Sequence, residues 1–148
     1  MGVYLAKPCT EVDVEEGRDH SMHYAVGDMQ GWRKSMEDAH IAVPNINRLY
    51  SFLTEQEIPR MSLFAVFDGH GGKEVALYCQ NRFLDELTQL SAFKEKDYAA
   101  ALRECFHRID FMLEDEIYNE ELEYYRSVQN PSDLAIGDRT GNVLLIQK

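Results

Sequence analysis

The sequence predicts an α+β fold in which strands come first and two long helices follow. Short apolar segments of strand length end at Asp68. Residues 73–90 and 97–125 then repeat apolar positions at helical spacing, and residues 142–148 again have strand character. Because a final strand needs a partner, we expect the chain to be the front part of a larger α+β domain.

The strand region is predicted element by element. The first 21 residues are polar and acidic, and we expect a loosely ordered lead-in there, with a partial domain over residues 22–148 that lacks its C-terminal half. A short strand is predicted over residues 23–26, and a second, after a loop, over residues 36–43. Residues 61–67 have apolar side chains on both faces of the predicted strand, which is typical of a strand central in a sheet.

Two helices are predicted next, separated by a break at residues 91–97. The first places apolar residues on one stripe, namely Val75, Ala76, Cys79, Phe83, Leu87 and Leu90. The second is predicted to begin after Asp97, whose side chain can cap it. Its apolar residues recur at spacings of three and four, namely Leu102, Phe106, Ile109, Leu113 and Ile117.

The composition restricts the kinds of partner. The formal net charge is −11 and the sequence pI about 4.8, which excludes a general nucleic-acid binder because phosphate backbones need a basic surface. Three cysteines at unrelated spacings indicate a reducing, cytoplasmic compartment rather than a disulfide framework. A phosphorylated ligand would therefore need a local positive centre, either an arginine or a bound metal.

The N-terminus raises the question of lipidation. Gly2 stands where an N-myristoyl group is attached, although Ala6 replaces the usual Ser or Thr of that motif. Cys9 is a second candidate for lipid attachment, and the alternative is an ordinary leader in which Gly2 is incidental. Membrane association and a nuclear location both stay open beside the cytoplasmic one.

Asp68 ends the predicted central strand and opens the segment Asp-Gly-His-Gly-Gly. A carboxylate that follows a buried strand is costly unless it is paired, hydrogen-bonded or bound to a cation. The glycines allow close backbone approach or positive φ angles, but the segment lacks the pattern of a nucleotide-binding loop. A tight turn with a capping Asp68 is the alternative.

A second acidic motif lies in residues 30–40, Gln-Gly-Trp-Arg-Lys-Ser-Met-Glu-Asp-Ala-His. In the predicted strand, Glu37 shares a face with apolar residues, whereas Asp38 points to the other face. Two carboxylates directed into an interior repel each other unless a divalent cation lies between them, and hard oxygen ligands suit Mg²⁺ or Mn²⁺. An exposed acid is the alternative for Glu37, and a plain surface arginine is the alternative for Arg33.

These two motifs together closely resemble the N-terminal signature blocks of the metal-dependent protein phosphatase 2C-type family. The likeness covers about residues 22–125 and implies the N-terminal portion of a four-layer α-β-β-α sandwich with two Mg²⁺ or Mn²⁺ ions at one end. It implies that Asp68 bridges both metals and that Glu37 and the carbonyl of Gly69 ligate one. Asp38 is similar to the acid that holds a metal-bound water, Arg33 to the phosphate-binding arginine, and His70 to the proposed general acid.

The resemblance implies a protein serine/threonine phosphatase, a hydrolase that attacks phosphoserine or phosphothreonine of phosphorylated proteins with a metal-bridging hydroxide. The family completes its metal site with two aspartates further downstream, and neither Asp133 nor Asp138 matches them. We therefore expect an N-terminal fragment or truncated form with weak metal binding and little activity alone, which dimerises through exposed sheet edges. The alternatives are a non-catalytic phosphatase-like protein with a binding or regulatory role, and an unrelated α+β module.

Overall fold

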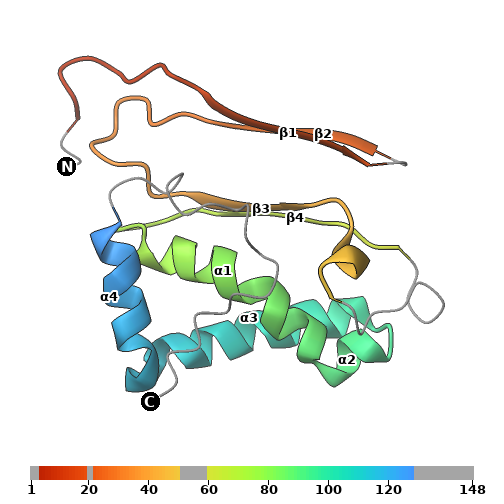
Figure 1. Ribbon diagram of the computed structural model, residues 1–148. Coiled ribbons are helices and arrows are strands. Elements are labelled where there is room, and N and C mark those ends of the chain that lie inside the picture. The colour runs from red at the N-terminus through yellow and green to blue at the C-terminus, as the bar shows by residue number, and fades with distance from the viewer. Residues whose placement is uncertain (1–3, 20–21, 51–59, 129–148) are drawn as a thin grey trace.

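The computed structural model describes residues 4–19, 22–50 and 60–128, and its mixture of helices and strands confirms an α+β fold (Figure 1). The elements in chain order are β1 Asp13–Asp19, β2 Met22–Asp28, β3 Ala39–Val43, η1 Ile46–Arg48, β4 Leu63–Phe67, α1 Glu74–Gln89, α2 Ser91–Lys94, α3 Tyr98–Glu114, η2 Glu116–Tyr118 and α4 Asn119–Ser127.

The strands form two antiparallel pairs that lie over one another (Figure 1). Strand β1 pairs with β2, and β3 pairs with β4 in the register that sets Ala39 opposite Phe67. The rings of Tyr24 and Phe64 join the two pairs, with their centroids 5.4 Å apart. Figure 1 shows helices α1, α2 and α3 on the other side of β3–β4, so this pair lies between the β1–β2 ribbon and the helices.

The core lies between β3–β4 and the helices. Leu77 and Tyr78 of α1 and Ala101 and Cys105 of α3 are fully buried there. The Cys105 thiol donates to the carbonyl of Phe83 (3.4 Å), and burial raises the pKa of this thiol to about 12. Small side chains on α3 let the two helix backbones approach closely, so these helices form a packed scaffold for the strand ends.

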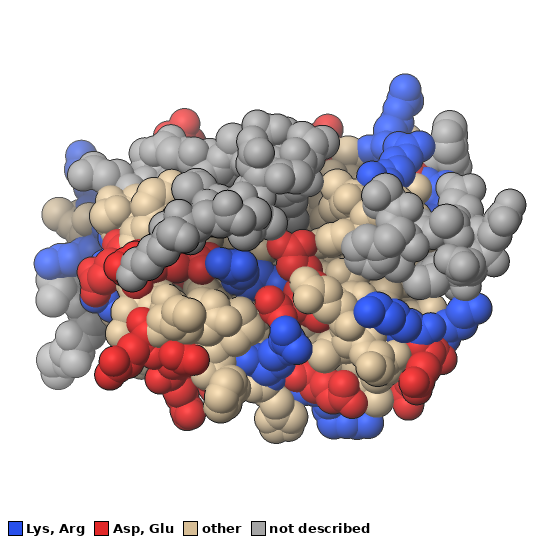
Figure 2. Space-filling model, turned by 60° about the horizontal axis from the view of Figure 1, so that its bottom comes forward, with Lys and Arg blue, Asp and Glu red and all other residues tan. Residues whose placement is uncertain are grey.

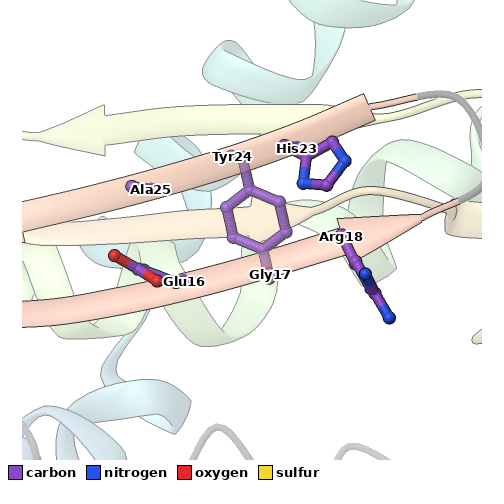
Figure 3. Close-up of a pocket in the computed structure, with 6 residues that line it drawn as sticks. All are labelled: Glu16, Gly17, Arg18, His23, Tyr24 and Ala25. Atoms are coloured by element: carbon purple, nitrogen blue, oxygen red, sulfur yellow. The ribbon is translucent and has the colours of Figure 1, made fainter.

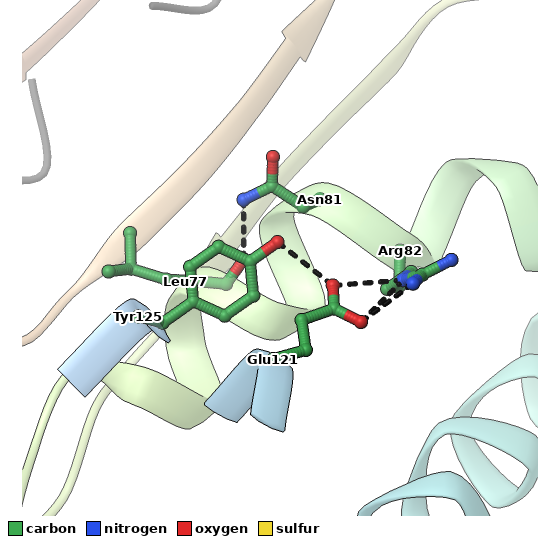
Figure 4. Close-up of polar contacts among 5 residues, drawn as sticks. All are labelled: Leu77, Asn81, Arg82, Glu121 and Tyr125. Atoms are coloured by element: carbon green, nitrogen blue, oxygen red, sulfur yellow. Dashed lines mark hydrogen bonds and ion pairs between the residues drawn. The ribbon is translucent and has the colours of Figure 1, made fainter. Parts of the chain in front are cut away.

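Helix α4 is held to α1 by a polar junction at Glu121 (Figure 4). The Glu121 carboxylate accepts hydrogen bonds from Arg82 Nε (3.0 Å), Arg82 Nη2 (2.6 Å) and the Tyr125 hydroxyl (3.0 Å). The hydrogen bond with Glu121 raises the pKa of Arg82, while burial and Glu121 together raise the pKa of Tyr125. This bidentate pair ties the start of α4 to the middle of α1.

Ion pairs also join the helices to one another on the helical side. Arg108 of α3 pairs with Glu86 of α1, and Arg126 of α4 pairs with Glu74 at the start of α1 (3.0 Å). Figure 2 accordingly shows acidic and basic side chains interspersed on this side rather than separated into two patches.

The structure corrects the expectation for the first 21 residues. Strand β1 lies inside the range expected to be loosely ordered, and it pairs with β2 along its whole length, from Asp13 opposite Asp28 to Asp19 opposite Met22. The strand was not predicted because β1 has polar side chains on both faces, and the apolar–polar alternation that indicates a strand is therefore missing.

The helical predictions are confirmed in outline and wrong in three details. Asp97 caps α3 by accepting from the Ala100 N–H (3.0 Å), as expected. The expected single helix over residues 97–125 is instead interrupted by η2, and the expected break at residues 91–97 contains the short helix α2. The predicted stripe is correct at Ile109, which is buried, but it is displaced by one position in the preceding turns, since Ala101 and Cys105 are buried whereas Leu102 and Phe106 are exposed.

Several sequence-based expectations lie outside the described residues, including Gly2, Asp133, Asp138 and the strand at residues 142–148. Within the described part of the chain, no helix combines the length and apolar character needed to cross a membrane.

Candidate functional site

The two motifs singled out in the sequence meet at one end of the β3–β4 pair. The register Ala39 opposite Phe67, continued beyond both strands, sets Asp38 opposite Asp68 and Glu37 opposite Gly69. The Gly69 N–H donates to Asp38 Oδ1 (3.2 Å), which joins the two segments directly. Residues thirty positions apart in the sequence therefore belong to one site.

Gly69 is required at this junction by close approach. A Cβ atom added there would lie 2.2 Å from the carbonyl oxygen of Glu37, which is backbone and cannot move aside. The chain then turns through Gly71 and Gly72, both at positive φ, into the first turn of α1. The glycines thus bring the backbone of one motif against the backbone of the other and lead it into the helix.

A hollow of about 230 Å³ opens beside this junction. Glu37 borders it from the β3 side, and the glycine turn and the end of α4 border it from the others. Its lining residues are Ser35, Glu37, Gly71, Gly72, Lys73, Glu74 and Arg126. The Ser35 hydroxyl donates to Glu37 Oε1 (3.0 Å) and orients that carboxylate.

Two ties hold the end of α4 against the glycine turn. Arg126 Nε donates to Glu74 Oε1 (3.0 Å), and Lys73 Nζ donates to the carbonyl of Val128. Burial acts to raise the pKa of Glu74, but hydrogen bonds from its own backbone N–H and from Arg126 outweigh burial and lower the pKa below its ordinary value. The ionised Glu74 is therefore part of the wall of the hollow.

The predicted site residues differ in exposure. Arg33, Asp38, Asp68 and His70 are exposed, whereas Glu37 is half-buried. The expectation that Glu37 lies on a strand face is wrong, because β3 begins only at Ala39 and Glu37 belongs to the loop before it.

The expectation of a strand buried on both faces before Asp68 is also wrong within the described residues. Strand β4 pairs there only with β3, and its outer residues Phe64 and Val66 are 46% and 76% exposed. Asp68 follows on this same exposed face, so its carboxylate is open to solvent in the structure described. Its position at the strand end, rather than burial, makes it a ligand candidate.

The chemistry of the donors fits a hard divalent cation. Glu37, Asp68 and the Gly69 carbonyl offer oxygen atoms only, which suit Mg²⁺ or Mn²⁺ better than Zn²⁺. Among residues 4–19, 22–50 and 60–128, however, no group of three or more His, Cys, Asp or Glu side chains is arranged to hold a metal ion. The described residues thus offer part of a coordination shell, which further ligands would have to complete.

A second, larger hollow of about 560 Å³ lies on the β1–β2 ribbon (Figure 3). The Tyr24 ring lies across Gly17 on the neighbouring strand, and the hollow is lined by Glu16, Gly17, Arg18, His23, Tyr24 and Ala25. None of the predicted site residues borders it. Of those residues only Glu37 borders the smaller hollow, and we place the site there because Ser35 and Glu37 of one motif meet Gly71 and Gly72 of the other.

Sequence reasoning missed four residues that line the site, Ser35, Lys73, Glu74 and Arg126. Ser35 lies within one motif, and Lys73 and Glu74 directly follow the other. Their position near the site could therefore have been inferred from the sequence. Arg126 lies more than fifty positions after the glycine turn, and only the packing of α4 on α1 brings it there.

Comparison with known proteins identifies the family of this chain. The protein phosphatase 2C family model matches residues 22–128. The chain is 42% identical over 146 residues to "Probable protein phosphatase 2C 5" of Paramecium tetraurelia, covering 99% of this chain and 45% of that protein. It is 38% identical over 148 residues to "Protein phosphatase 2C 1" of the same organism, again covering 45% of it.

A plant relative, "Probable protein phosphatase 2C 60" of Arabidopsis thaliana, is 36% identical over 114 residues, which are 77% of this chain and 29% of that protein. The chain therefore spans less than half the length of the curated relatives it matches. The family match covers most of the described residues and includes both motifs at the β3–β4 end. On this ground the chain belongs to the protein phosphatase 2C family.

Proposed function

We propose that this chain forms the N-terminal portion of a metal-dependent protein serine/threonine phosphatase of the four-layer α-β-β-α type. The observation that carries the proposal is the junction of Gly69 with Glu37 and Asp38, which unites the two motifs at one strand end. The names of the relatives support a protein phosphatase, and phosphorylated proteins are the substrates that follow from it.

In the proposed site, Glu37, Asp68 and the Gly69 carbonyl hold Mg²⁺ or Mn²⁺. When bound, such ions activate a water and neutralise phosphate charge, which an acidic protein needs in order to hold a phosphoester. Asp38, which already accepts a hydrogen bond from the Gly69 N–H, has a second oxygen available to orient a water.

Two further residues act on the phosphoester itself. Arg33 offers a planar fork of N–H donors that binds nonbridging phosphate oxygens, and its exposure leaves it accessible to a protein substrate. His70 lies one residue after the Gly69 junction, where it donates a proton to the departing serine or threonine oxygen. Arg33 thus binds the substrate, and His70 acts on its leaving group.

A non-catalytic role is the second candidate, because the described residues supply only part of a metal shell. A chimera separates the two candidates. The 148 residues replace the matching segment of "Protein phosphatase 2C 1" of Paramecium tetraurelia, which provides the remaining length. We expect the chimera to release phosphate from a phosphoserine peptide with Mn²⁺, and His70→Ala to lower kcat by about 10²-fold or more. A folded chimera without turnover would support the non-catalytic role.

Metal binding is tested on the chain itself by electron paramagnetic resonance of Mn²⁺. Asp68→Asn removes a proposed ligand while keeping the shape of the side chain, and we expect affinity to fall about tenfold or more. Asp110→Asn on the exposed face of α3 makes the same change in charge far from the site and should leave affinity unchanged. Equal Mn²⁺ affinity in the two variants would contradict the assignment of Asp68.

A further inference from the structure

The N-terminal segment, residues 4–9, runs beside the turn that carries Arg33. The Leu5 N–H donates to the carbonyl of Trp32 (2.9 Å). Cys9 and Gly31 exchange two backbone hydrogen bonds, from Cys9 N–H to Gly31 O (2.8 Å) and from Gly31 N–H to Cys9 O (3.0 Å). Three backbone hydrogen bonds therefore attach this segment to the Gln30–Arg33 turn.

The turn has little else to hold it in place. Its own closing hydrogen bond, from the Arg33 N–H to the Gln30 carbonyl, is long (3.4 Å), and the Gln30 side-chain amide donates to the Arg33 carbonyl (2.9 Å). Trp32 and Arg33 are both exposed. Among the described residues the Arg33 guanidinium makes no hydrogen bond or ion pair, so its position depends on the backbone of the turn.

The conformation of Gly31 shows that the backbone of this turn is one that few residues other than glycine adopt. Its φ is +65°, and a Cβ added there would meet nothing within 4 Å. The need for glycine at this position is therefore conformational and not steric. The residue that adopts this left-handed conformation is the same one that forms two hydrogen bonds with Cys9.

We propose that residues 4–9 position Arg33 for phosphate, so that the N-terminal segment sets substrate affinity without touching the substrate. An exposed arginine loses conformational freedom when it binds, and a turn already fixed by a neighbouring segment of the chain lowers that loss. This inference rests on the proposed role of Arg33 in phosphate binding. The segment acts through its backbone, so substitutions that remove an N–H should have an effect that side-chain truncation lacks.

The test uses the 148-residue chain and inorganic phosphate as the probe, followed through the NMR signal of the Arg33 Nε–H group. Cys9→Pro removes the N–H that donates to Gly31, and we expect phosphate affinity to fall about three- to tenfold. Thr10→Pro introduces the same residue one position later, where no hydrogen bond from the N–H is found among the described residues, and should bind as the unaltered chain does. Cys9→Ala keeps the N–H and should bind phosphate as the unaltered chain does.

Leu5→Pro removes the N–H that donates to the Trp32 carbonyl, and it takes the place of Cys9→Pro if that variant does not fold. A second pair of variants addresses the turn directly. Gly31→Asn tolerates the left-handed conformation, whereas Gly31→Val does not. We expect only Gly31→Val to weaken phosphate binding, with circular dichroism of both variants unchanged. A double-mutant cycle is read by isothermal titration calorimetry with phosphate, because Arg33→Ala has no Arg33 signal, and Cys9→Pro should add no further loss of affinity when Arg33 is already alanine.

The outcomes separate this inference from the function on which it rests. If the Arg33 signal of the unaltered chain does not respond to phosphate, the proposed role of Arg33 fails and the positioning role fails with it. If that signal responds but Cys9→Pro binds as Thr10→Pro does, the positioning role alone is overturned. Equal losses from Cys9→Pro with and without Arg33 would likewise overturn it.

Discussion

The helical side and the strand-end site of this protein differ in how completely they are enclosed. On the helical side, Leu77, Tyr78 and Cys105 are fully buried, and arginine–glutamate pairs join α1 to α3 and α4. At the strand ends, Arg33, Asp68 and His70 are exposed, and backbone hydrogen bonds do most of the positioning. The scaffold is therefore complete within the described residues, whereas the site has one side open.

This difference agrees with the extent of the family match. The chain spans 45% of the length of its Paramecium relatives, and the proposed metal shell would need further ligands on this open side. The comparison predicts that substitutions in the scaffold change stability and that substitutions at the strand ends change binding. The following variants test the scaffold in order of decreasing effect.

The largest effect is expected from Leu77→Ala in the first turn of α1. Leu77 is 0% exposed, so truncation leaves a cavity between the helices and β3–β4 and should lower the free energy of unfolding by about 2–5 kcal/mol. Ile117→Ala removes a similar volume from a side chain that is 74% exposed and should cost less than about 0.5 kcal/mol. Urea unfolding measures both changes in the free energy of unfolding. Equal changes would contradict the distinction between an enclosed scaffold and an open surface.

An intermediate effect is expected from Glu121→Ala at the α1–α4 junction. This change leaves Arg82 and the Tyr125 hydroxyl without their acceptor, at a cost of about 1–3 kcal/mol. Glu120→Ala changes the neighbouring exposed acid and should be within about 0.5 kcal/mol of the unaltered chain. If thermal unfolding showed the two variants to be alike, α4 would be held by apolar contacts alone.

The smallest effect is expected where the two regions meet, in Arg126→Gln. Because folding holds the pKa of Glu74 below its ordinary 4.5, this interaction stabilises the fold above pH 4.5 and is lost as the pH falls through the lower folded-state value. The variant should therefore melt at a lower temperature than the unaltered chain at pH 7, and the difference should shrink at pH 3 and in high salt.

Arg103→Gln on the exposed face of α3 provides the control, since it removes one positive charge away from Glu74. Arg126 also pairs with Glu123, so a difference that persisted at pH 3, or that Arg103→Gln reproduced, would show that Arg126 does not act through these two carboxylates.

Local patterns were sufficient for α1, for the start of α3 and for the motifs. The apolar spacing of residues 73–90 predicted α1, and Asp97 predicted the start of α3, because both depend on contacts within a few positions of the chain. The phase of α3 was misjudged, since Leu102 and Phe106 are more hydrophobic than the buried Ala101 and Cys105. Close packing against α1 selects the smaller pair, which no periodicity within α3 reveals.

By itself, the sequence determined the α+β class, the identity of the two acidic motifs and the family to which they belong, because each depends on residue types at fixed short spacings. Tertiary structure alone decided that Glu37 meets Gly69, that Arg126 reaches Glu74, and that residues 4–9 pair with the Arg33 turn. These contacts join positions some twenty to fifty residues apart, and they follow from strand register and helix packing. Register and packing arise only when the whole chain folds, and local propensity does not encode them.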